Sequence, residues 1–171
     1  MKSIVSLKKR LSDNNILCVQ NERGFIMEAE FEWNTPASDS DIFEYERNNN
    51  VSLPESYKEF LKISNGAILF KDKQYGQWGC KICGINELNI VNEKVRAIRG
   101  NFPDSWLVFA TWLGDTDLLI FDLSKYNSGE KKYILDGDEC DSEDEFDYIN
   151  GDFEKWLDRL IVAQGSKYWR W

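Results

Sequence analysis

The chain has 171 residues and a net charge of −9, and it contains seven Trp, seven Tyr and ten Phe but no His. This aromatic content argues against a disordered chain, because large rings bury much surface on folding, and no stretch approaches the roughly 20 apolar residues of a membrane-spanning helix. The missing His excludes Ser-His-Asp and Cys-His catalysis and every His-based metal site. The length suits a single domain over residues 1–171.

The first part of the chain indicates a helix, a hairpin and a second helix. Residues 1–12 have the pattern of a short amphipathic helix and lack the apolar run of a secretory signal, so we expect a cytoplasmic protein. Residues 16–20 and 25–31 are expected to pair as a hairpin, because apolar residues alternate in the second of them. Ser38, with Asp41 three residues later, predicts the N-cap of the second helix.

Residues 52–67 are the most informative stretch of the chain. Pro54 suits the first turn of a helix, where its missing N–H costs nothing. Apolar residues then recur at helical spacing, so one stripe of this helix is expected to face a core. A closing Asn-Gly pair tolerates the left-handed backbone of a helix end. The residues of this signature are Leu53, Pro54, Tyr57, Phe60, Leu61, Asn65 and Gly66.

The middle of the chain indicates short strands interrupted by one helix. Residues 87–99 are predicted to be helical, because their apolar residues recur in steps of three and four. The order of the elements is helices, then a meander of strands, then a last helix. This order predicts an α+β domain with a mostly antiparallel central sheet and helices packed on it. The strands are expected at residues 68–70, 78–85, 106–112, 117–123 and 131–135, with turns at 71–77 and 114–116.

The end of the chain combines an acidic segment with the clearest amphipathic helix. Residues 136–154 hold ten acidic residues and no Lys or Arg, and we expect them to form an exposed loop. Such a segment repels nucleic acid and attracts a basic partner. Asp152 then caps a helix, and an aromatic tail over residues 162–171 closes the chain. The side chains of this helix expected to point inward are Phe153, Trp156, Leu157, Leu160 and Ile161.

These segments together resemble the SUKH superfamily, the Smi/Knr-like proteins. The signature combines Leu-Pro, a Tyr three residues after the Pro, Phe-Leu three residues further on, and the closing Asn-Gly. Residues 37–47 are similar to the first conserved helix of the family, and residues 83–88 to its strand that runs through a Gly into a short helix. Residues 106–122 resemble its central hairpin, although their turn lacks the second Gly often seen, and residues 152–157 resemble its closing helix. The resemblance covers about residues 37–161.

The resemblance implies a binding module without catalytic residues, metal or cofactor, in bacteria commonly an immunity protein that neutralises a toxin by direct binding. A nuclease toxin must carry a basic groove for phosphates, and an acidic inhibitor can occupy that groove. We therefore expect a basic toxin domain as the partner, and no direct binding of nucleic acid or membrane. The fungal relatives imply an alternative, an intracellular adaptor or regulatory scaffold, and an enzyme that uses carboxylates is a third hypothesis. The first 36 residues correspond to a region that varies within the family, and they support none of these three hypotheses.

Candidate partner-binding residues lie in the acidic segment and around the central hairpin. An acidic run is equally typical of a solvated loop that aids solubility. Trp112, Trp169 and Trp171 are candidate interface anchors, but core or sheet-edge packing is the favoured interpretation for them. The candidate partner-binding residues are Asp138, Glu139, Asp141, Glu143, Asp144, Glu145, Trp112, Asp115 and Asp117.

Two weaker motifs favour structural interpretations. Cys80 and Cys83 form a CxxC, but a zinc site needs about four ligands, and positions 80 and 83 of a strand would point to opposite faces. These thiols, with Cys18 and Cys140, are therefore expected to be reduced and structural. Residues 136–147 match a calcium-binding loop only in part, because Cys140 stands where the pattern requires Asp or Asn.

Overall fold

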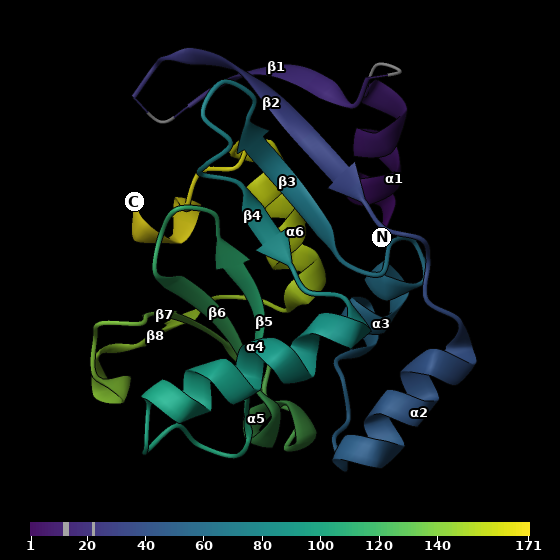
Figure 1. Cartoon of the computed structure of the whole chain (residues 1–171), viewed down its shortest axis with the longest axis vertical. Coiled ribbons are helices and arrows are strands. Elements are labelled where there is room, and N and C mark those ends of the chain that lie inside the picture. The colour runs from purple at the N-terminus through teal and green to yellow at the C-terminus, as the bar shows by residue number, and fades with distance from the viewer. Residues whose placement is uncertain (12–13, 22) are drawn as a thin grey trace.

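The computed structural model describes residues 1–11, 14–21 and 23–171. Within these residues the chain folds into one eight-stranded antiparallel sheet with helices packed on it (Figure 1). Each strand pairs with its neighbours in sequence, so the strand order in the sheet is the order along the chain. The predicted α+β class and antiparallel sheet are confirmed. The strands are β1 (Ile16–Gln20), β2 (Ile26–Trp33), β3 (Ala67–Asp72), β4 (Cys80–Ile82), β5 (Trp106–Trp112), β6 (Asp117–Asp122), β7 (Ile134–Asp138) and β8 (Asp147–Ile149).

The two ends of the sheet carry different kinds of connection. Because antiparallel neighbours alternate in direction, successive connections fall at opposite ends. The connections β1–β2, β3–β4, β5–β6 and β7–β8 contain no α-helix and lie on the left of Figure 1; we call this the turn end. The connections at the other end carry α2 to α5. The helices are α1 (Lys2–Arg10), α2 (Asp39–Asn49), α3 (Glu55–Leu61), α4 (Ile85–Ile98), α5 (Leu123–Asn127) and α6 (Phe153–Val162), with 3₁₀ turns η1 (Glu143–Glu145) and η2 (Tyr168–Arg170).

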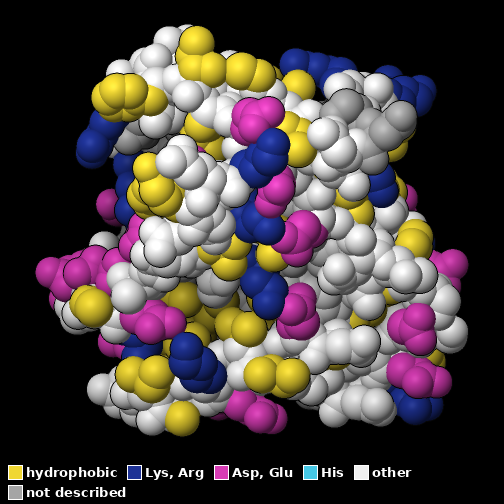
Figure 2. Space-filling view, turned by 45° about the horizontal axis from the view of Figure 1, so that its top comes forward, with side chains coloured by type: hydrophobic (Ala, Val, Ile, Leu, Met, Phe, Trp, Pro, Cys, Tyr) yellow, Lys and Arg dark blue, Asp and Glu magenta, His cyan; other side chains and the backbone are white. Residues whose placement is uncertain are grey.

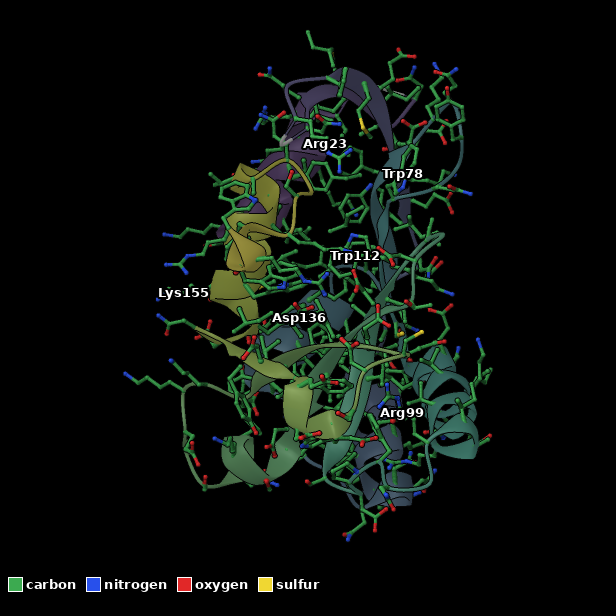
Figure 3. The ribbon with its side chains drawn as sticks, turned by 90° about the vertical axis from the view of Figure 1, so that its left-hand side faces the viewer. Arg23, Trp78, Arg99, Trp112, Asp136 and Lys155 are labelled. Carbon is green, nitrogen blue, oxygen red and sulfur yellow. The ribbon has the colours of Figure 1, made fainter. Side chains whose placement is uncertain are left out.

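Helices pack on both faces of the sheet, with α6 on one side and α4 over part of the other (Figure 3). Under α6, beside α1 and α3, Tyr57, Phe109, Phe121, Phe153 and Trp156 are fully buried. Phe109 and Phe121 stack with their ring centroids 3.9 Å apart, so neighbouring strands are tied by aromatic packing. A smaller core lies under α4 and contains Val95, Phe102, Val108, Leu118, Ile120, Leu135 and Phe146.

The helix N-caps expected from the sequence are present. The Ser38 hydroxyl accepts the N–H of Asp41 at 3.1 Å, and the Asp41 carboxylate accepts the N–H of Ser38 at 2.9 Å, so a capping box begins α2. The Asp152 carboxylate accepts the N–H of Lys155 at 2.9 Å and begins α6. The inward stripe predicted for α6 is buried, except that Ile161 is half-buried.

The signature helix is shorter than predicted, and its Asn-Gly pair has a different role. The apolar stripe is fully buried as expected, but α3 ends at Leu61. The side-chain oxygen of Asn65 accepts the N–H of Ile85 at 2.8 Å, so Asn65 caps the start of α4. Gly66 has a φ of +87°, and an added Cβ there would lie 2.6 Å from the nitrogen of Gly84. The signature therefore joins α3, β3 and α4, and its residues build the fold.

Two further expectations are corrected. The strand predicted over residues 78–85 is confined to β4, because α4 already begins at Ile85. The helix α5 was not predicted; the Asp122 carboxylate accepts the N–H groups of Ser124 and Lys125 at 3.1 and 3.2 Å and caps it. Among the described helices, none is both long and apolar enough to cross a membrane.

Candidate protein-binding surface

The acidic segment, residues 136–154, is not the exposed loop that its composition predicted. It contains the end of β7, the 3₁₀ turn η1, the edge strand β8 and the start of α6. Phe146 and Ile149 are buried between its acidic residues and anchor it to the sheet. An added Cβ on Gly137 would lie 2.6 Å from the ring of Phe146, so only glycine allows this close approach. The segment is an ordered part of the sheet that presents carboxylates.

Arg99, just after α4, fixes the backbone of the acidic segment. Its side chain is only 8% exposed and donates to the carbonyls of Asp138 and Asp141 at 2.5 and 2.6 Å. It also pairs with the Glu143 carboxylate at 3.0 Å. A hydrogen bond from the backbone of Glu143 itself, followed by the one from Arg99, lowers the pKa of that carboxyl. Glu143 therefore serves the local structure.

Several other carboxylates of the segment remain free. Within the described part of the chain, the side chains of Glu139, Asp141 and Asp147 make no hydrogen bond or ion pair, and Asp141 and Asp147 are exposed. Asp144 is exposed, and hydrogen bonds from the Ser142 hydroxyl and from its own backbone lower the pKa of its carboxyl. These groups give the β7–β8 edge an uncompensated negative charge.

Basic side chains of the C-terminal tail neutralise acidic side chains on and beside the neighbouring strands. Arg170 donates to Asp136 at 2.6 and 2.8 Å and to Asp117 at 2.9 and 3.2 Å. Lys167 pairs with Asp115 at 2.8 Å and with Asp117, which is only 3% exposed. The hydrogen bond from Lys167 lowers the pKa of the Asp115 carboxyl. We call this group of two basic and three acidic side chains the C-terminal clamp.

A pocket of about 660 Å³ lies between the acidic segment and the tail. Its walls come from β7, β8, η1 and the residues around η2, and Figure 3 shows Asp136 near the middle of a view onto the turn end. Its acidic lining residues are Asp117, Asp136, Asp138, Asp141, Glu145 and Asp147, and its basic ones are Arg159 and Arg170.

The carboxylates of Asp115, Asp117 and Asp138 are close enough to hold a cation together. One oxygen from each lies within 4.8 Å of the others, and this is the one such group among the described residues. Two of the three already pair with Lys167 and Arg170 of the clamp. The cationic groups of the tail therefore supply the positive charge that this cluster needs.

The structure separates the predicted binding residues into exposed and buried ones. Trp112 is 5% exposed, packs edge-on against Trp169 at 5.7 Å and lies under the Lys167 ammonium; this agrees with the favoured packing interpretation, and the alternative of a surface anchor is not met. Asp117 is likewise buried in the clamp. Trp171, in contrast, is exposed. Of the remaining candidates, Asp115, Asp141, Asp144 and Glu145 are exposed, and Asp138, Glu139 and Glu143 are partly buried.

Sequence reasoning missed an exposed aromatic pair on the β3–β4 turn. The predicted turn at Tyr75 is confirmed, but Trp78 precedes β4 and does not belong to a strand, and both side chains are exposed at the turn end. Their centroids lie 5.8 Å apart in an edge-on arrangement. The flanking Gly76 and Gly79 are the signal that could have placed Trp78 in the turn.

Cys80 and Cys83 are buried thiols of the core. The strand ends at Ile82, so the alternation argument does not extend to Cys83, and both thiols lie in the same hydrophobic cluster. Burial raises the pKa of the Cys83 thiol to about 12 and that of Cys80 further still. Protonated thiols are poor nucleophiles and poor metal ligands. Cys18 and Cys140 are exposed free thiols.

Comparison with known proteins gives a family match over most of the chain. The model of the SMI1 / KNR4 family (SUKH-1) matches residues 36–159. The uncharacterized protein YobM of Bacillus subtilis (strain 168) is 27% identical over 174 residues, which cover 99% of this chain and 90% of that protein. The uncharacterized protein YnaB of the same organism is 28% identical over 83% of this chain and 88% of its own length. The KNR4/SMI1 homolog 1 of Debaryomyces hansenii is 28% identical over 102 residues, which are 58% of this chain and 22% of that protein.

Proposed function

The chain belongs to the SMI1/KNR4 family (SUKH-1), and from this premise we propose that it is a non-enzymatic immunity protein that neutralises a cognate toxin domain by direct binding. The partner we propose is a basic nuclease domain, met in the cytoplasm. The observation that carries the proposal is the ordered acidic segment with uncompensated carboxylates. A nuclease must hold phosphates in a groove of Lys and Arg, and a rigid array of carboxylates can occupy the same groove.

The geometry of the segment suits protein binding. Arg99 and the buried Phe146 hold the backbone, so the exposed Asp141, Asp144 and Asp147 are presented from a fixed platform. A preorganised surface loses less entropy on binding than a mobile loop. Complementary charge raises the rate of encounter, and rapid encounter matters for an inhibitor that must act before the toxin cleaves nucleic acid.

The chemistry of the side chains favours binding over catalysis. A carboxyl that acts as a general acid or base near neutral pH needs a raised pKa. Hydrogen bonds and nearby cations instead lower the pKa of the Asp115, Asp138 and Glu143 carboxyls. These groups stay ionised at neutral pH, so their chemistry does not suit proton transfer.

A second candidate function is an adaptor or regulatory scaffold. The relative from Debaryomyces hansenii favours it, because the matched region is only 22% of that protein. In that protein, the matched region is one part of a longer chain. An adaptor would bind a partner without inhibiting an enzyme.

The experiment that tests the proposal uses as the partner a nuclease toxin domain sought among the genes adjacent to this one. The purified full chain is titrated into that domain by calorimetry, and nuclease activity is measured across the same titration. We expect a one-to-one complex and loss of activity at stoichiometric addition. A complex without inhibition would favour the adaptor, and no complex at micromolar concentrations would overturn the proposed function.

A further inference from the structure

The turn end has an apolar half beside the acidic segment. Phe25 and Ile26, where the β1–β2 turn meets β2, and Tyr75 and Trp78 of the β3–β4 turn are large hydrophobic side chains that are exposed. The two turns are neighbours, because β2 pairs with β3. Figure 2 shows hydrophobic side chains along the top of the molecule and a group of acidic side chains lower on the left.

Trp78 has a backbone conformation that bulky residues rarely adopt. Its φ is +61°, in the left-handed region that glycine and asparagine occupy far more readily. Such conformations persist only where the surrounding structure enforces them. Here the N–H of Trp78 donates to the carbonyl of Leu113 at 2.8 Å. The next residue is Gly79, where an added Cβ would lie 2.8 Å from the Cα of Lys71.

The side chains of the strained turn make few contacts that would stabilise the fold. The Trp78 side chain is 53% exposed and the Tyr75 side chain 63% exposed, and the ring contact between them is the one aromatic contact described for either. A glycine or asparagine at position 78 would adopt the same backbone with less strain. An indole held outward at an energetic cost indicates a role outside the fold.

The aromatic turn is connected to the acidic segment. Leu113, which accepts the hydrogen bond from Trp78, begins the β5–β6 turn. In the same turn, the Thr116 hydroxyl donates to the Asp138 carboxylate at 2.7 Å, and its carbonyl accepts the N–H of Glu139 at 3.0 Å. One hydrogen-bonded series of turns therefore runs from the aromatic pair to the acidic segment, and in Figure 3 Trp78 lies above and to the right of Asp136.

We propose that Tyr75 and Trp78 anchor the partner, a basic toxin domain whose Lys and Arg residues meet the acidic segment while an apolar depression beside them receives the Trp78 ring. This inference rests on the proposed function and names the contact that holds the complex together. Charge complementarity identifies the partner as basic, because the acidic segment lies at the same end of the sheet as the aromatic turn, with the β5–β6 turn between them. Trp and Tyr are the residues in which binding energy concentrates at interfaces.

The two halves of the surface have separable kinetic effects. Charged groups at the rim of an interface act mainly on the association rate. Buried aromatic anchors act on the dissociation rate, because their contacts are complete only in the docked complex. A substitution in the aromatic pair should therefore change the lifetime of the complex and leave the rate of its formation nearly unchanged.

The test compares Trp78→Ala with Phe43→Ala in the full chain, with the same toxin domain as the partner. Phe43 is a matched control, because its side chain is 62% exposed and lies on α2, away from the turn end. We expect Trp78→Ala to raise the dissociation rate about 30-fold, which corresponds to a loss of about 2 kcal/mol. Phe43→Ala should stay within about twofold, and Tyr75→Ala should fall between the two.

The possible results separate this inference from the proposed function. Denaturation midpoints equal to wild type for all three variants establish that folding is not the cause. If the wild-type chain binds the toxin domain and Trp78→Ala dissociates from it at the wild-type rate, the inference that Trp78 is an anchor is overturned and the proposed function stands. If the wild-type chain does not bind the toxin domain, the proposed function is overturned and the inference falls with it.

Discussion

Two charged surfaces of this molecule differ in how their carboxylates are paired. On the outer face of β2, β3 and β4, acidic side chains alternate with lysines, and Figure 2 shows them as a row down the middle of the view. We call this row the charge ladder. Its pairs are Glu28 with Lys73 at 2.8 Å, Glu30 with Lys71 at 3.1 Å, Glu32 with Lys71, and Glu87 with Lys81 at 2.6 Å.

The acidic segment is different, because most of its exposed carboxylates form no ion pair among the described residues. Arg99 and Arg170 pair with Glu143 and Asp136, whereas the side chains of Asp141 and Asp147 have no partner within the described residues. Pairing across strands cancels the field of the ladder at short range, while unpaired charges of one sign add together. The number of charged residues therefore does not identify a binding surface, but their pairing does.

Both surfaces depend on one aromatic core, and breaking that core should have the largest effect. Trp156 is fully buried, with its ring 5.4 Å from Phe109 and 5.6 Å from Phe153. We expect Trp156→Ala to lower the free energy of unfolding by about 3–5 kcal/mol in chemical denaturation. Val162→Ala, at an exposed position of the same helix, should change it by less than about 0.5 kcal/mol. A wild-type midpoint for Trp156→Ala would contradict this packing.

In the C-terminal clamp, the Asp117 carboxylate stabilises the fold. Asp117→Asn removes a buried charge that faces Lys167, which is partly buried, and Arg170, which is exposed. We expect a loss of about 1–3 kcal/mol in the free energy of unfolding. Asp141→Asn is the matched control and should have the stability of wild type, since Asp141 is exposed. Equal midpoints for the two variants would mean that the clamp contributes nothing to the fold.

Acid should weaken the clamp, with a smaller effect. Lys167 lowers the pKa of the Asp115 carboxyl, so this pair stabilises the folded chain at pH values above the ordinary Asp pKa of about 4. The contribution disappears as the pH falls through the lowered pKa of the folded state. Denaturation midpoints between pH 6 and pH 3 should therefore fall less in Lys167→Met than in wild type. Parallel curves would show that the pair carries no pH-dependent stability.

The helices were largely predictable because their signals are local. Ser38 and Asp41 lie three residues apart, and the apolar stripe of α6 repeats within ten residues, so neither depends on distant parts of the chain. The signature of α3 was recognised for the same reason. The role of Asn65 was missed, because its hydrogen bond to Ile85 joins residues twenty positions apart.

The surface was harder to predict because it depends on contacts that are distant in sequence. The burial of Trp112 follows from Trp169 and Lys167, more than fifty residues later. The acidic segment was expected to be a loop because charged residues outnumber its two buried anchors, and β8 has only three residues. The position of Trp78 follows from a positive φ, which periodicity cannot reveal.

The central claim is that unpaired carboxylates, and not acidic residues in general, attract the partner. It is tested by the association rate with the toxin domain, measured by stopped flow at low and physiological salt. One variant changes Asp141, Asp144 and Asp147 to Asn, and its control changes Glu28, Glu30 and Glu32 of the ladder to Gln, so both lose three negative charges.

We expect the first variant to associate about 10-fold more slowly than wild type at low salt and to depend less on salt. The ladder variant should stay within about twofold of wild type at physiological salt, because the ladder lies on β2 to β4, away from the acidic segment, and salt screens its charges from the partner. Equal slowing of the two variants would contradict the account, since net charge alone would then explain the attraction. An unchanged rate in the first variant would show that the acidic segment does not face the partner.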